Sequence, residues 1–284
     1  MTSRSRHLSR RQILAGVGTV GLVTAGAGLG RGFRGDPPYT HYTYAQEQDG
    51  GPDLLVAWYE TYNGDPVSPP DRSSPGLEPT NGSFGDAAAS GAFADELDLA
   101  FETRGPVVDV PNVVPGDSGT LLVGLTVAAE SGTVWFRPHL PTELPDGTRN
   151  FAENGRTEPE VEAGDDSDDL GELQDVLELS VWYDTGVLNS GVAGACNGSQ
   201  DPGETVLASG TLVDVAEQLA GGVRLQTELF GSCLDPEEPR CLGVRWEVPA
   251  DAGNAVQTDS VRFDLQFVAT ACEETATNPF GGEQ

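Results

Sequence analysis

The stretch Asn254–Cys272 reads NAVQTDSVRFDLQFVATAC, and its centre alternates between apolar and polar side chains. The apolar positions are Val261, Phe263, Leu265 and Phe267, and the polar positions between them are Arg262, Asp264 and Gln266. Side chains of a β-strand point alternately to its two faces, so the pattern predicts a strand with one buried face and one face in water. Such a strand needs a second sheet over its apolar face and neighbours along its edges.

Other short segments have the composition of strands, and turn signals such as Pro115-Gly116-Asp117 separate them. These segments are 54–62, 97–102, 121–128, 133–137, 176–183, 223–230, 242–248 and 261–269. One helix is predicted after Thr211, which can cap it, and Gly221-Gly222 ends it. Many short strands with little helix predict an all-β fold, a jelly-roll-like β-sandwich with one short helix and long acidic and Gly-Pro loops.

The composition also suggests how the chain is divided. Residues 1–27 are expected to be an export signal, and 28–52 a flexible N-terminal segment. Residues 53–272 form a single sandwich domain in this prediction, with a disordered tract near 66–92, and 273–284 form a C-terminal tail. The acidic stretch Glu158–Asp169 is predicted to be a solvated loop between the two halves of the sandwich.

The charge of the chain is strongly negative. Its 45 acidic and 15 basic residues give a formal net charge of −30, and every basic residue is an arginine. Such a surface stays hydrated in concentrated salt, where screening reduces the mutual repulsion of its charges, so it is typical of a halophile. Nucleic acid is not an expected partner, because the chain after residue 28 has no cluster of basic residues to contact phosphates.

The N-terminus has the layout of an export signal. Arg10 and Arg11 form a twin-arginine pair, and a weakly apolar run rich in Gly and Ala follows them. Ala25 and Ala27 supply the small residues that a signal peptidase needs, which predicts cleavage after Ala27. The alternative is an uncleaved membrane anchor, which would be the only contact with a membrane, but the run from Ile13 to Gly30 is poorly apolar for a stable span.

An exported chain can form disulfides, and the four cysteines are Cys196, Cys233, Cys241 and Cys272. No CxxC pair occurs, so a four-cysteine zinc site is not expected. Of the three possible connectivities, we expect Cys233 with Cys241 and Cys196 with Cys272, since the first pair closes a short hairpin-like loop. Two Asn-Gly-Ser triplets make Asn81 and Asn197 candidate glycosylation sites.

One polar loop has the residues of a cation site. Oxygen atoms of Asn197, Ser199, Asp201 and Glu204 suit a hard cation such as Ca²⁺, although the full EF-hand pattern is absent. The alternative is a solvated turn of an acidic protein. No other cofactor is expected.

Motifs of hydrolases are missing. After the signal region only His41 and His139 remain, no HExxH motif supplies zinc ligands, and no GxSxG elbow marks a nucleophile. We expect His139 to be a packing residue at a strand end, and the protein not to be an enzyme.

Several segments together resemble the TasA/camelysin-like group of secreted proteins, in particular its halophile members described as having SipW-dependent-type signal peptides. The segments that carry the resemblance are Val114–Gly119, Gly171–Leu173, Val181–Asp184, Cys241–Pro249, Gly253–Asn254, Gln257–Leu265 and the closing Cys272. In order and spacing they span most of Leu97–Cys272.

The resemblance implies a jelly-roll sandwich and the role of a subunit of cell-surface fibres or biofilm matrix. In such fibres the extended N-terminal segment of one subunit completes the sheet of the next, so the partner is the protein itself or a related surface protein. The β-prone residues after the signal are Tyr39, Thr40, His41, Tyr42, Thr43 and Tyr44, which are the expected donor strand or, alternatively, a linker. The family's usual Ser-Ala-Tyr-Phe-Ser-Asp type of segment is missing here.

Two other functions remain open at this point. A monomeric cell-surface module for adhesion or for binding glycans or proteins would have the same sandwich without self-association. Camelysin was named as a peptidase, so the resemblance also offers a metallopeptidase, for which this sequence supplies no metal triad.

Overall fold

The structure is a computed structural model that describes residues 41–44, 51–66, 106–110, 112–127, 130–144, 146–153, 157–164, 171–189, 195–226, 232–236, 239–273 and 276–281. All of these residues belong to the second of two units of the chain, 32–284. The predicted signal with Arg10, Arg11, Ala25 and Ala27, the tract 67–92, the strand predicted at 97–102 and the candidate glycosylation site Asn81 lie outside the described residues.

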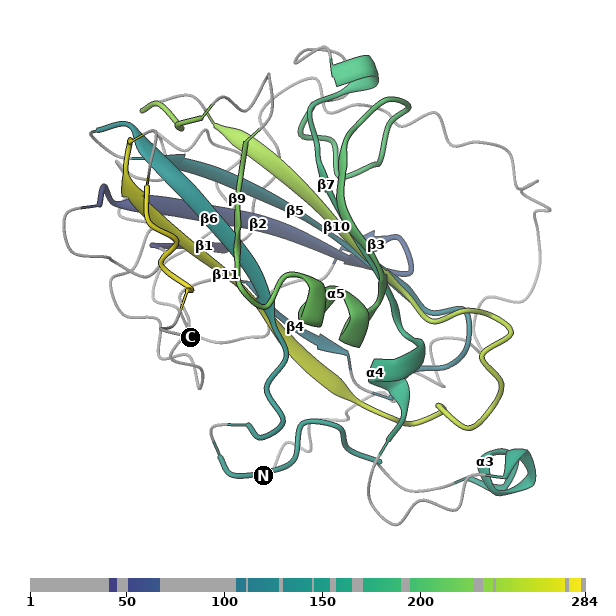
Figure 1. The fold of residues 1–284 in the computed structure, drawn as a ribbon. Helices are drawn as coiled ribbons and strands as arrows, with labels where there is room; N and C mark the ends of the chain where they lie inside the picture. The colour runs from purple at the N-terminus through teal and green to yellow at the C-terminus, as the bar shows by residue number, and fades with distance from the viewer. Residues whose placement is uncertain are drawn as a thin grey trace, which may run out of the picture. The chain divides into compact units, whose positions relative to one another are not determined.

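Two antiparallel sheets make up the described fold (Figure 1), which confirms the predicted all-β sandwich. Sheet A has seven strands in the order β1-β2-β5-β10-β7-β8, with β3 paired to β2. Its strands are β1 (His41–Tyr44), β2 (Leu54–Tyr62), β3 (Asp65–Pro66), β5 (Ser118–Val127), β7 (Glu178–Tyr183), β8 (Val206–Thr211) and β10 (Arg240–Glu247). Sheet B has the order β4-β11-β6-β9, with β4 (Val107–Val110), β6 (Gly132–His139), β9 (Val223–Arg224) and β11 (Val261–Ala271).

The chain passes repeatedly from one sheet to the other, as in a jelly roll. β4 of sheet B precedes β5 of sheet A, β6 returns to sheet B, and β9, β10 and β11 alternate in the same way. Consecutive strands therefore face each other across the core more often than they pair side by side. Apolar residues at every second position of β5, β7, β10 and β11 fill the space between the sheets.

The core confirms the period-two pattern of the opening stretch. Val261, Phe263, Leu265 and Phe267 are each at most 1% exposed, and they belong to one continuous apolar cluster with strands of sheet A. Phe267 lies opposite Phe136 of β6 in the sheet, with 5.2 Å between ring centroids. Asp264 is the exception on the polar face, because it is buried rather than wet.

The described part of the chain contains three short α-helices, where the sequence analysis predicted one. The predicted helix is α5 (Leu212–Gln218), and the hydroxyl of Thr211 accepts the backbone N–H of Asp214 at 3.2 Å, which confirms the N-cap. The others are α4 (Leu173–Val176), which shortens the strand predicted at 176–183, and α3 (Glu158–Ala163). A 3₁₀ turn, η1 (Val187–Asn189), follows β7.

The prediction of a solvated loop at Glu158–Asp169 is wrong for its first half, which is α3. Thr157 precedes the helix, a proline lies in its first turn, and Gly164 ends it at a φ of 97°. The backbone N–H of Thr157 donates to the carboxylate of Glu160, and Glu160 is fully buried. The high acidity of the stretch concealed these helix signals.

Helix α5 connects the two sheets, since it follows β8 of sheet A and leads to β9 of sheet B. Its buried side chains include Leu212 and Val215, which pack in the common core. Part of the predicted C-terminal tail also packs on this region, because the side-chain amide of Asn278 donates to the carbonyl of Gly221 at 2.7 Å. The guanidinium of Arg137 lies 4.5 Å from the ring centroid of Phe280.

No helix among the described residues is long and apolar enough to span a membrane.

Candidate functional site

The predicted donor segment contributes an edge strand to its own chain. β1 pairs antiparallel with β2 from His41 opposite Trp58 to Tyr44 opposite Leu55. The expectation that this segment lies outside the sandwich is therefore wrong for His41, Tyr42, Thr43 and Tyr44, while Tyr39 and Thr40 lie outside the described residues. The physical reason is that β2, paired on its other side with β5, has a row of main-chain groups that need partners.

β1 is a short edge strand on a long neighbour. It has four residues against nine in β2, and β2 is its only strand neighbour among the described residues. Its place in the sheet is thus set by main-chain hydrogen bonds to a single strand. Any extended segment with the same side-chain alternation could satisfy these bonds, including the same segment of another copy.

The disulfides differ from the predicted pairing. Cys196 is bonded to Cys241 and Cys233 to Cys272, with Cα–Cα distances of 5.4 and 5.7 Å. The predicted bond between Cys233 and Cys241 would have to join the two sheets, because Cys241 lies in sheet A and Leu234 pairs with Gly132 of sheet B. Each disulfide in the structure instead joins two cysteines that lie in, or next to, the same sheet.

Strand neighbours explain both bonds. Cys196 follows β7 in the chain and bonds through its N–H to the carbonyl of Asp184, and β7 is the neighbour of β10, which contains Cys241. On sheet B, Gly132 is paired both with Leu234 and with Ala271, which places Cys233 beside Cys272. Sequence spacing alone contains no information on these strand neighbours.

The side chains of the predicted calcium loop form hydrogen bonds within the loop. The side-chain amide of Asn197 donates to Asp201 at 2.9 Å, its carbonyl accepts the N–H of Ser199 at 2.7 Å, and Glu204 accepts the N–H groups of Asp201 and Gly186 at 2.7 and 2.6 Å. Among the described residues no group of three His, Cys, Asp or Glu side chains is placed to hold a metal ion. The side-chain oxygen atoms of Asn197, Asp201 and Glu204 thus stabilise the turn, and Ca²⁺ binding by this loop remains a prediction.

A buried carboxylate that the sequence analysis missed anchors this loop. Asp184, at the end of β7, is 1% exposed and accepts the N–H of Gly198 at 2.7 Å. Burial, together with the neighbouring carboxylate of Glu204, raises the pKa of Asp184 to about 7, although the N–H group of Gly198 acts to lower it. The Nδ2 atom of Asn197, to which a glycan would be attached, is engaged with Asp201.

His139 ends β6, as predicted, and its ring is held by a buried acid. Its Nδ1 atom lies 2.7 Å from Oδ1 of Asp264, which is directly opposite on β11. The second oxygen of Asp264 accepts the side-chain amide of Gln266 at 2.9 Å, and Arg137 donates to Gln266 at 2.7 Å. These four side chains form a polar ladder on the outer face of sheet B. His41 belongs to sheet A, so the two histidines lie in different sheets.

Another buried acid, Asp259, joins segments that are distant in the sequence. It is fully buried, and its Oδ2 atom accepts the N–H groups of Glu172 and Leu173 at 2.7 and 3.1 Å, which fixes the start of α4. Gly171 makes this contact possible, because a Cβ atom there would lie 2.5 Å from Cγ of Asp259. The segments Gly171–Leu173 and Gln257–Leu265, which carry the family resemblance, therefore meet at this carboxylate.

The surroundings of Asp259 are acidic. The hydroxyl of the adjacent Thr258 lies 3.2 Å from Glu153 and 3.0 Å from the buried Glu160 of α3. Burial, together with the carboxylates of Glu153 and Glu172, raises the pKa of Asp259 to about 7, although the N–H groups of Glu172 and Leu173 act to lower it. No local sequence motif predicts this cluster, because its members come from four separate segments.

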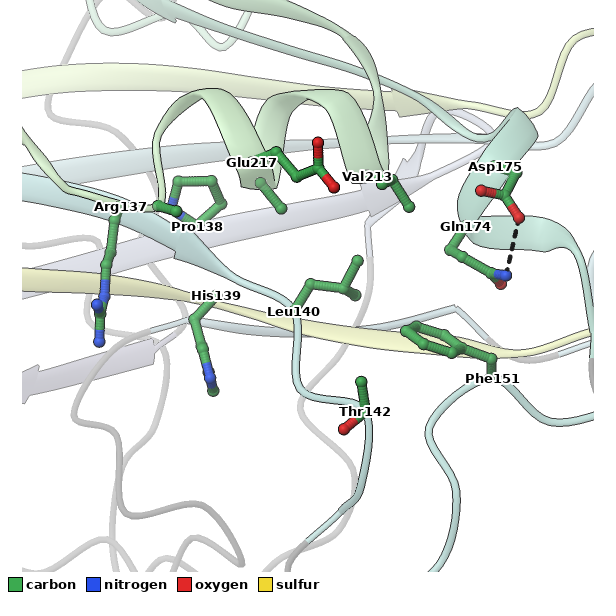
Figure 2. Close-up of a pocket in the computed structure, with 12 residues that line it drawn as sticks. Arg137, Pro138, His139, Leu140, Thr142, Phe151, Gln174, Asp175, Val213 and Glu217 are labelled. Atoms are coloured by element: carbon green, nitrogen blue, oxygen red, sulfur yellow. Dashed lines mark hydrogen bonds between the residues drawn. The ribbon is translucent and has the colours of Figure 1, made fainter.

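A pocket of about 490 Å³ lies where the end of β6 meets α4 and α5 (Figure 2). Helix α5 contributes Val213, Ala216 and Glu217, α4 contributes Gln174 and Asp175, and Leu140 and Phe151 come from the segment after β6. Arg137 and His139 of β6 complete its wall. The sequence analysis singled out only His139 among these residues, because the pocket is formed by elements that tertiary structure brings together.

Comparison with protein-family models finds none that matches this chain, and comparison with curated proteins gives no match either.

Proposed function

We propose that the protein is an exported structural subunit that forms fibres at the cell surface by exchanging its N-terminal strand, β1, between copies. The observation that carries this proposal is the position of β1 at the edge of sheet A, where β2 is its one partner among the described strands. In a monomer the strand completes its own sheet. In a fibre the same residue pairs form between neighbours, so exchange conserves the main-chain hydrogen bonds.

Three further features support an exported subunit. The twin-arginine segment directs export. The two disulfides suit an oxidising compartment outside the cytoplasm. The resemblance to TasA/camelysin-like proteins implies a fibre or matrix role, and the partner is then a second copy or a related surface protein.

Cross-linking across the β1–β2 pair tests strand exchange. Tyr42 is opposite Ala57 in the register, so the double variant Tyr42→Cys, Ala57→Cys places two thiols side by side. All four native cysteines of the mature chain are in disulfides, so only the new pair is free to react. After assembly in concentrated salt and mild oxidation, exchange produces a covalent ladder of multimers on a denaturing gel, whereas a closed monomer produces an internal disulfide.

Two controls make the result specific. The variant Tyr42→Cys, Tyr59→Cys is out of register by two residues on the same face, and we expect a much weaker ladder. A chain that begins at Gln46 lacks β1, and it should fold without forming fibres in electron micrographs. Fibres from this truncated chain would show that the donor is another segment.

The alternative function is a monomeric module for adhesion or binding, and the pocket beside α5 is the observation that favours it. A mature protein that stays monomeric at all concentrations in concentrated salt, with the Tyr42→Cys, Ala57→Cys pair closed internally, would support this module in place of the fibre subunit. A camelysin-like metallopeptidase has no specific support among the described residues.

A further inference from the structure

The pocket beside α5 has an apolar base that includes an aromatic ring. Leu140, Phe151 and Val213 are each half-buried there, and Figure 2 shows them around one space between α5 and the segment that follows β6. Apolar side chains that line a concave surface and remain partly exposed favour a ligand with an apolar face.

One wall of the pocket contains an acceptor without a partner. The side-chain nitrogen of Gln174 donates to Asp175 at 3.0 Å (Figure 2), and a carboxylate can only accept, so the amide orientation is fixed. The Oε1 atom of Gln174 is consequently a buried acceptor, and it has no hydrogen-bond partner among the residues that the structure describes. Leaving such an atom unpaired is unfavourable, so a ligand would be bound more tightly if the half-buried Gln174 side chain turned its oxygen towards a donor in the pocket.

The other polar groups are of mixed type. Glu217 is an exposed acceptor on α5, whereas Arg137 is a donor on β6. His139 is held through its Nδ1 atom by Asp264, so its second ring nitrogen remains for contacts. The pocket thus offers both donors and acceptors around its apolar base.

These properties select a class of ligand. A phosphate or an acidic ligand would be repelled by Asp175 and Glu217 in a protein of net charge −30. A cation would be repelled by the guanidinium of Arg137. An alkyl chain has no donor for the side-chain oxygen of Gln174. A neutral sugar has hydroxyl groups that both donate and accept, and its C–H faces pack on apolar side chains. We propose that this pocket binds a neutral sugar unit.

The proposal is independent of strand exchange, because the pocket is built from β6, α4, α5 and the segment after β6, and β1 contributes nothing to it. Saturation-transfer NMR of the folded protein in concentrated salt tests it, with the methyl glycosides of glucose, galactose, mannose and N-acetylglucosamine as probes. We expect saturable transfer for at least one glycoside, and we expect Gln174→Ala to weaken it by about three- to tenfold, the effect of one neutral hydrogen bond.

Gln218→Ala is the matched control, since Gln218 is an exposed glutamine of α5 that does not line the pocket. We expect this variant to bind like the parent. Lack of saturable binding by all four glycosides overturns the proposal. Equal weakening by Gln174→Ala and Gln218→Ala also overturns it, as does saturable binding of N-acetylphenylalanine amide without binding of any sugar, which would indicate a peptide ligand.

Discussion

At the scale of single residues, buried carboxylates organise the ends of the strands. Asp184 holds the loop after β7, Asp264 holds His139, and Asp259 holds the start of α4. A carboxylate that accepts backbone N–H groups at a strand end replaces the hydrogen bonds that a regular sheet would provide there. In a chain with so many acidic residues, these three belong to the few that are buried, a group that also includes Glu160.

Asp259 is expected to make stability depend on pH. Its pKa is about 7 in the folded protein and near 4 in the unfolded chain, so the folded state binds the proton more tightly. Its contribution to stability is fully present below about pH 4 and is lost as the pH rises towards 7, at no more than about 1.4 kcal/mol per pH unit for one proton. Asp259→Asn should therefore be more stable than the parent at pH 8 and should lose this part of the pH dependence.

The measurement is urea unfolding at several pH values and constant salt concentration. The asparagine oxygen can still accept the N–H groups of Glu172 and Leu173, and its neutral NH₂ group removes the repulsion from the carboxylates of Glu153 and Glu172. Asp251→Asn in the same connection between β10 and β11 is an exposed control that should leave the pH profile unchanged. A loss of stability at pH 8 in Asp259→Asn would contradict the prediction.

At the scale of elements, pairs of glycine and tryptophan join neighbouring strands of sheet A. Gly243 of β10 is opposite Trp182 of β7, and Gly119 of β5 is opposite Trp246 of β10. A Cβ atom at Gly243 would lie 2.0 Å from the Trp182 indole, so the ring occupies the space that a side chain would fill. Each glycine thus lets a large ring lie flat over the neighbouring strand.

Gly243→Ala is expected to destabilise the fold by about 1–3 kcal/mol, because the added Cβ atom would displace the Trp182 ring, which is 1% exposed. Gly221→Ala is the control, since no atom lies within 4 Å of a Cβ placed there. We expect the control to stay within about 0.5 kcal/mol of the parent. Guanidinium unfolding followed by tryptophan fluorescence measures both, and equal stability of the two variants would contradict the assigned role of Gly243.

At the scale of the whole molecule, the negative net charge is expected to govern how folding and assembly depend on salt. The 45 acidic residues outnumber the 15 basic residues, so the charges of the chain repel one another on balance. Among the described residues only a few ion pairs, such as Arg262 with Asp109 at 2.8 Å, offset this repulsion. Repulsion of this kind is long-ranged in dilute salt and is screened in concentrated salt. Assembly of copies into fibres would increase it further, so folding and assembly should both depend on salt.

The melting temperature is expected to rise as NaCl is raised from about 0.1 M to about 1 M, over which the Debye length falls from about 10 to about 3 Å. Thermal unfolding followed by circular dichroism measures this rise. Choline chloride at equal ionic strength should produce a similar rise if screening is the cause. A melting temperature that is independent of salt, or one that responds to sodium alone, would contradict the prediction.

Local patterns in the sequence determined the main elements. The alternation at Val261–Phe267 predicted β11 and its buried face, and the cap at Thr211 predicted the start of α5, because both signals depend only on neighbouring residues. A sandwich then follows, since strands with one apolar face must cover each other. The all-β fold could thus be predicted from the sequence alone.

Tertiary structure alone decided the rest, because it depends on which distant segments become neighbours. The disulfide partner of Cys196 is set by the pairing of β7 with β10, and the place of β1 is set by the free edge of β2. Burial of Asp264 depends on the packing over sheet B, and the pocket depends on the meeting of β6 with α4 and α5. Long-range contacts of this kind leave no periodic trace in the chain, so sequence reasoning determined the layers and the structure determined the sites.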